Sequence, residues 1–120
     1  MATFDADTLG VLRDVRELRI RTDKHPASAV VIWVVVEGDA VFVRSFRGAK
    51  GRWYRDLAKG GPATLEAGHR KIAVQAITAN DPASIERASR GFLSKYRSSS
   101  YAQAMVQPDV LPTTLRLEPR

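Results

Sequence analysis

The longest apolar run of the chain, Ala29–Val36 (AVVIWVVV), restricts its fold more than any other segment. Its eight residues are far fewer than the roughly 20 that a membrane-spanning helix needs. They match the length of a β-strand that is buried on both faces, and β-branched residues around one tryptophan favour that assignment. We therefore expect Trp33 to be buried in a β-sheet core, where its replacement by alanine would cost roughly 3–5 kcal/mol.

The segments on either side of this run predict further short strands joined by tight turns. Tight turns connect antiparallel neighbours, because parallel strands require long crossover connections. The expected elements are a helix capped by Asp7, a strand over 18–22, a hairpin of Ala29–Val36 with Ala40–Phe46, a helix over 52–58, paired strands Ala63–Glu66 and Lys71–Thr78, a helix capped by Asp81 with Pro82 at its first position, a helical turn or two over 101–106, and a final strand Thr113–Leu117. Together they predict a mainly β (α+β) fold, an antiparallel barrel, closed or half-closed, of about six strands with flanking helices. One domain is expected to fill residues 1–120.

Composition excludes several classes of site. The chain has no cysteine, which excludes disulfides, thiolate metal sites and cysteine nucleophiles. His25 and His69 are its only histidines, too few for a histidine metal cage, so no metal is expected. The first ten residues, MATFDADTLG, lack the basic start and apolar core of a signal peptide. The expected location is the cytoplasm, without a membrane segment.

The richest chemistry lies in residues 43–59, VRSFRGAKGRWYRDLAK. Its basic residues are Arg44, Arg47, Lys50, Arg52, Arg55 and Lys59, and Asp56 is its only acid. Glycines let backbone amides approach a ligand, arginine can grip a phosphate through two donors, and aromatic rings can stack on a flat ring. The segment therefore predicts a site for a phosphate attached to a ring. The alternative is a solvated basic face with Trp53 as core filler.

No catalytic residue stands out. Ser45 has no histidine near it in sequence, so a serine triad is unsupported. Glu37 and Glu66 are isolated, and Gly48–Gly51 (GAKG) lacks the spacing of a P-loop.

The block IWVVVEGDAVFVRSFRGAKGRWYRDL, with the later KYR and TTLRLEP, resembles a family of small uncharacterised bacterial proteins. That family is similar to the flavin-binding split β-barrel superfamily, whose members include pyridoxamine-phosphate oxidase and the deazaflavin-dependent nitroreductases. The resemblance implies a split β-barrel and a two-fold dimer with the coenzyme, FMN or a deazaflavin, at the subunit interface.

The resemblance also implies which residues hold the coenzyme. Serine or threonine and basic residues at the end of the third strand and the start of the next helix would bind its phosphate, and a residue ending the first strand would lie near its rings. The corresponding positions here are Thr22, Arg44, Ser45, Lys50, Gly51, Arg52 and Trp53. The implied activity is hydride transfer by an oxidoreductase.

Two alternatives remain open at this point. A pI of about 10.2 and a net charge of +6 also fit a non-catalytic module that binds nucleic acid or another anionic partner. The chain could also be a barrel that has lost its coenzyme.

Overall fold

The computed structural model describes residues 2–120. These residues form the helices α1 (Ala6–Asp14), α2 (Arg52–Leu57) and α3 (Pro82–Lys95), the 3-10 turns η1 (Gly48–Lys50), η2 (Ala102–Val106) and η3 (Leu111–Thr113), and the strands β1 (Leu18–Thr22), β2 (Val30–Ile32), β3 (Val35–Glu37), β4 (Ala40–Val43), β5 (Gly61–Ala67), β6 (Arg70–Thr78) and β7 (Leu115–Pro119).

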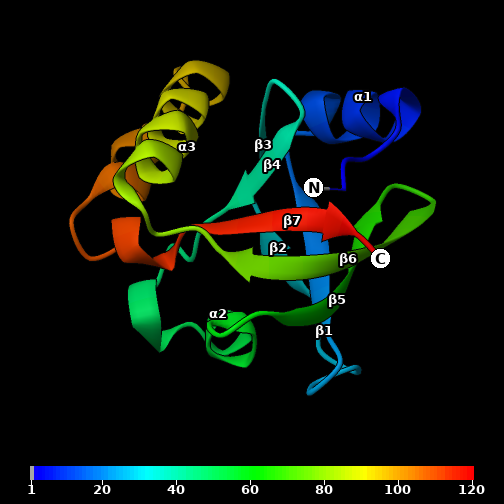
Figure 1. Ribbon diagram of the computed structural model, residues 1–120. Helices are drawn as coiled ribbons and strands as arrows, with labels where there is room; N and C mark the ends of the chain where they lie inside the picture. Colours follow the sequence, from blue (N-terminus) through cyan, green and yellow to red (C-terminus); the bar gives the residue numbers. More distant parts are fainter. Residues whose placement is uncertain (1) are drawn as a thin grey trace.

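The strands form one antiparallel sheet in the order β2-β1-β5-β6-β7-β4-β3, which curls into a half-barrel (Figure 1). The predicted mainly β fold, with antiparallel pairing and flanking helices, is confirmed. The count of seven strands rather than about six arises because the apolar run Ala29–Val36 contributes two strands.

The apolar run does not form one continuous strand. It divides at Trp33 and Val34, so that β2 pairs with β1 at one edge of the sheet and β3 pairs with β4 at the other. The predicted hairpin therefore involves only the second half of the run. Because two strands adjacent in the chain lie at opposite ends of the strand order, the sheet must curl until its edges approach each other.

The last residue of α3 and the residue that follows it hold this break in the run with their side chains. The Lys95 ammonium donates to the carbonyl of Val34 at 2.7 Å, and the Tyr96 hydroxyl accepts from the Val34 amide at 3.3 Å. A buried backbone group without a partner would cost free energy comparable to a lost hydrogen bond, so these contacts replace the missing sheet ladder. Burial lowers the pKa of Lys95 to about 8 and raises the pKa of Tyr96 to about 12.

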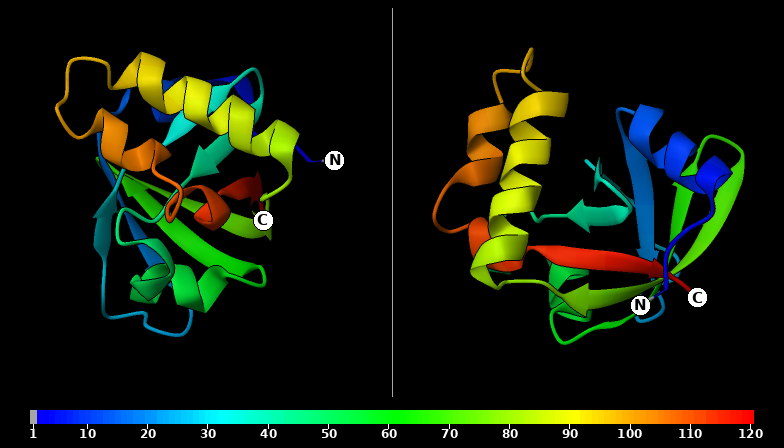
Figure 2. Two further views of the ribbon diagram at one scale, coloured as in Figure 1. Left: turned by 90° about the vertical axis from the view of Figure 1, so that its left-hand side faces the viewer. Right: turned by 45° about the horizontal axis from the view of Figure 1, so that its top comes forward.

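Side-chain alternation along β4 divides the core into two clusters. Val41 and Val43 face the inside of the half-barrel, whereas Ala40 and Phe42 face outward and are covered by α3 and η2. Figure 2 shows α3 as a separate layer beside the curled sheet. Strand β4 is consequently buried on both faces.

Helix positions follow their capping residues. Asp81 caps α3 by accepting a hydrogen bond from the Ser84 amide at 3.1 Å, as predicted. Helix α1 is capped by Asp5, two residues before the predicted Asp7.

Gly91 lets α3 approach β3 closely, because an added Cβ would lie 3.1 Å from Val35. The final strand is Leu115–Pro119, two residues later than expected, because η3 takes up Thr113.

None of the helices within residues 2–120 has the length and apolar character needed to cross a bilayer.

Candidate ligand cavity

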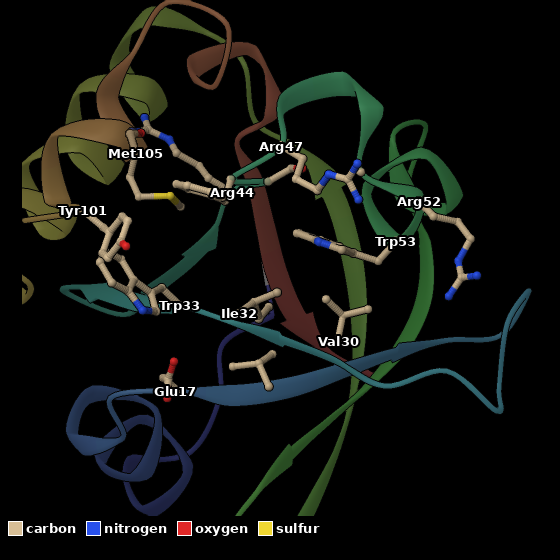
Figure 3. A pocket seen from close by; sticks show the side chains of 14 residues that line it. Glu17, Val30, Ile32, Trp33, Arg44, Arg47, Arg52, Trp53, Tyr101 and Met105 are labelled. Atoms are coloured by element: carbon tan, nitrogen blue, oxygen red, sulfur yellow. The ribbon is translucent and has the colours of Figure 1, made fainter.

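A cavity of about 810 Å³ opens where the half-barrel is incomplete (Figure 3). It lies between β2 at the sheet edge, the residues that follow β4, the start of α2, and η2 with the turn before it. Its lining residues are Glu17, Val30, Val31, Ile32, Trp33, Arg44, Ser45, Phe46, Arg47, Gly51, Arg52, Trp53, Tyr101 and Met105.

Aromatic and aliphatic side chains form most of its wall. Trp33 stacks on Tyr96 with ring centroids 3.8 Å apart and an angle of 4° between the planes. Trp53 is only 7% exposed and belongs to the core inside the half-barrel. In Figure 3, Trp33 and Tyr101 lie together on one side of the cavity, while Trp53 and Val30 lie on another. The two tryptophans therefore supply flat apolar surfaces to the same space.

Trp33 is the one aromatic side chain whose environment differs from the sequence prediction. It is half-buried on the cavity wall and is not part of either apolar core cluster, although it packs against the outer one. The break in the apolar run turns its side chain out of the sheet interior and onto the ring of Tyr96.

Ser45 carries an unused polar atom at the cavity. The residue is 1% exposed, and its hydroxyl is buried without a hydrogen-bond partner, while its backbone amide donates to Thr113 Oγ1 at 3.0 Å. Gly51 lies against it so closely that an added Cβ would be 2.5 Å from Ser45 Oγ. Buried hydroxyls normally have a partner, so this one is available to a ligand.

Arg44, by contrast, is committed to the protein itself. It is 1% exposed, and its guanidinium donates to Thr114 Oγ1 at 2.8 Å, to the Met105 carbonyl at 3.0 Å and to the Ile85 carbonyl at 2.9 Å. The guanidinium also lies over the ring of Phe92, 5.3 Å from its centroid. Burial lowers the pKa of Arg44 to about 10, so the group remains charged at neutral pH. Its role in this structure is to join β4 to α3 and η2.

The exposed basic residues around the cavity differ in their position. Arg47 and Arg52 line it, whereas Lys50 is exposed and does not contribute to its wall. Glu17 is the carboxylate that lines it, and Figure 3 places Glu17 away from both arginines. The cavity therefore has a cationic side and an acidic side.

Thr22 lies elsewhere, in a polar cluster between β1 and α2. Its hydroxyl donates to Asp56 Oδ2 at 2.6 Å, and His25 Nδ1 lies 2.6 Å from the same oxygen. Desolvation pushes the pKa of Asp56 upward, but the hydrogen bonds from Thr22 and His25, with nearby positive charge, outweigh it and lower the pKa. This cluster fixes the turn after β1 on α2, and Thr22 does not line the cavity.

The structure thus brings five of the seven expected residues to the cavity wall: Arg44, Ser45, Gly51, Arg52 and Trp53. The sequence offered no signal that Tyr101 and Met105, at the start of η2 and within it, would reach the cavity. Arg47 belongs to the predicted basic segment but was not among the expected ligands. Within residues 2–120, no group of three histidine or acidic side chains is arranged to hold a metal ion.

Residues 7–117 match the family model DUF2255, described as uncharacterized proteins conserved in bacteria. The chain belongs to this family. The matched region contains every residue of the cavity wall, so the cavity lies wholly within the family's domain. No curated protein matches the chain.

Two solved structures share the fold of this DUF2255 chain. A candidate general stress protein 26 from Jannaschia sp. CCS1 matches with a TM-score of 0.68 and 14% identity, over 94% of this chain and 71% of that one. A conserved hypothetical protein from Mycobacterium tuberculosis matches with a TM-score of 0.62 and 12% identity, over 98% of this chain and 79% of that one. At these identities the likeness establishes the fold alone.

Proposed function

We propose that the cavity binds a phosphorylated flavin or deazaflavin and that the protein serves as an oxidoreductase. The observation that carries this proposal is the unpartnered, buried hydroxyl of Ser45 on the wall of an aromatic cavity that also has Arg47 and Arg52. This combination suits a ligand that joins a flat ring system to an anionic group.

The dimensions and lining of the cavity support a ligand of this kind. Its volume of about 810 Å³ lies within the roughly 300–1,000 Å³ of cofactor and drug-sized sites. Arginine side chains bind phosphate through paired N–H donors, and the Ser45 hydroxyl can donate to an anionic oxygen. The rings of Trp33 and Trp53 provide the apolar surfaces against which a flat ring can pack.

The protein's own part in such a reaction is binding and orientation. A bound flavin or deazaflavin would supply the hydride chemistry, as coenzymes of this class do. Ser45, Arg47 and Arg52 would anchor the anionic end, and Trp33 and Trp53 would limit the access of water to the rings. Of the other four expected ligands, Gly51 contributes only backbone to the cavity wall. Arg44 and Thr22 use their donors within the protein, and Lys50 lies outside the cavity. The two-fold dimer stays a prediction.

Calorimetric titration of FMN, riboflavin and a phosphorylated deazaflavin into the parent protein and variants tests this proposal. Arg52→Ala should weaken FMN binding about ten- to a hundredfold, because a hydrogen bond to a charged group contributes about 1.5–3 kcal/mol. Riboflavin, which lacks the phosphate, should bind the parent and Arg52→Ala equally.

Lys71→Ala is the matched control, because Lys71 is an exposed lysine on β6 that does not line this cavity. It removes the same charge and should leave FMN affinity unchanged. If Arg52→Ala and Lys71→Ala weaken FMN binding equally, the loss follows from the change in net charge, and this result would contradict a phosphate site.

A further inference from the structure

Residues 47–59, which contain η1 and α2, present a group of exposed cations without partners. We call it the cationic stripe, and its members are Arg47, Lys50, Arg52, Arg55 and Lys59. Within residues 2–120, these side chains make no ion pair or hydrogen bond, whereas several arginines elsewhere do, as in Arg21 with Glu66 and Arg90 with Glu37. Unpaired cations gathered in one segment indicate an anionic partner.

The single acid of the segment does not neutralise this charge. Asp56 accepts hydrogen bonds from Thr22 and His25, and its side chain is 9% exposed. Those two partners belong to β1 and the turn that follows it, so the carboxylate is held against the sheet rather than among the exposed cations. The cationic stripe therefore faces solvent with its full charge.

Helical spacing aligns the α2 part of the stripe. Arg52 and Arg55 stand three residues apart, which places them on one side of α2, and Lys59 follows in the turn two residues after the helix ends. At about 1.5 Å per residue, the two arginines are separated by roughly 4.5 Å along the helix axis. Trp53 and Leu57 occupy the buried side. A row of exposed cations of this kind suits a partner that carries several anionic groups in a row.

Two exposed aromatic rings lie beside the stripe. Phe46 is 57% exposed and Tyr101 is 62% exposed, and their rings meet edge to face with centroids 6.2 Å apart. Both residues line the same cavity as Arg47 and Arg52, so aromatic surface and positive charge meet at its rim. Exposed aromatic rings next to cations are the stacking platform on which unpaired bases bind.

We propose that the cationic stripe and the Phe46–Tyr101 pair form a binding surface for single-stranded nucleic acid. The phosphates lie along Arg52, Arg55 and Lys59, and bases stack on the aromatic pair. A duplex fits less well, because its bases are already stacked and paired, and an acidic peptide would leave the aromatic rings unused. This activity is additional to coenzyme binding. The two share Arg47 and Arg52, but Lys50, Arg55 and Lys59 lie outside the cavity.

Fluorescence anisotropy with a labelled single-stranded DNA of about 12 nucleotides, a length within the range bound by single-strand-binding folds, tests the stripe. Arg55→Ala/Lys59→Ala should weaken binding about tenfold or more, and the slope of log K against log salt should become shallower by about 1.4. The matched control is Arg19→Ala/Lys71→Ala, which removes two exposed cations from a separate groove on β1 and β6. It should change the affinity less than twofold. Equal losses from both double variants would overturn the proposal, because binding would then follow net charge alone.

A second variant tests the aromatic pair. Phe46→Leu/Tyr101→Leu should weaken single-strand binding by about tenfold or more, given about 1–3 kcal/mol per stacked base. Its affinity for inorganic polyphosphate, which has no bases, should not change. Parent protein that binds polyphosphate or the matching duplex as tightly as the single strand would contradict recognition of unpaired bases.

FMN titration into Arg55→Ala/Lys59→Ala separates the two proposals, since coenzyme affinity should match the parent whether or not nucleic acid binds.

Discussion

Replacing Trp53 by alanine is expected to lower the free energy of unfolding by roughly 3–5 kcal/mol, the usual cost of truncating a buried aromatic residue. Trp53 is 7% exposed and packs in the cluster inside the half-barrel, which also contains Leu57 of the same helix. A loss of this size is a large part of the roughly 5–15 kcal/mol that stabilises a domain. Urea unfolding of parent and variant measures the change through the midpoint and slope.

Trp33→Ala is the internal comparison for this result. Trp33 is half-buried and stacks on Tyr96, so its loss should cost only about 1–2 kcal/mol, from an aromatic pair and partial burial. The sequence alone predicts the opposite order, with the larger loss of unfolding free energy for Trp33→Ala. If Trp33→Ala proves more destabilising than Trp53→Ala, the apolar run forms a continuous core strand after all.

Arg44→Met is expected to destabilise the protein by roughly 3 kcal/mol. Methionine fills part of the space but leaves the carbonyls of Ile85 and Met105 without their donors, and hydrogen bonds from a charged group contribute about 1.5–3 kcal/mol each. Burying the charged guanidinium is itself costly, and this burial also lowers the pKa of Arg44. Methionine removes that cost, which offsets part of the loss.

Arg47→Met serves as the control for Arg44→Met, because it removes an exposed cation three residues away and should change stability by no more than about 0.5 kcal/mol. Denaturation curves for the two variants give the comparison directly. Similar small effects for both would mean that the buried guanidinium does not hold α3 and η2 to β4.

Local sequence signals predicted the elements that depend on neighbouring residues. The β5–β6 hairpin and the start of α3 follow from turn residues and from Asp81 with Pro82, and both were confirmed. The division of Ala29–Val36 was not predicted, because it depends on pairing with β1 and β4. These strands lie on either side of the run in sequence, and each is the neighbour of an opposite edge strand of the sheet. The hydrophobic pattern alone cannot distinguish one continuous strand from two consecutive strands that pair with different neighbours.

The cavity was predicted in part for a similar reason. Ser45, Gly51, Arg52 and Trp53 reach it from one continuous segment, whose glycines and basic residues are visible in sequence. Arg44 follows the alternation of β4 and shares the outward face of Phe42, where α3 covers it. A basic residue at the end of a strand gives no sign of such a cover, so its burial could not be foreseen.

Tryptophan fluorescence during an FMN titration tests the central claim most directly, because Trp33 and Trp53 are the chain's two tryptophans and both line the cavity. A flavin bound there should quench most of the emission along a saturable curve, and Arg52→Ala should shift that curve to higher FMN concentration. The contradicting result is an emission that, after correction for flavin absorbance, shows no saturable quenching up to about 1 mM FMN, where binding would be worth only about −4 kcal/mol.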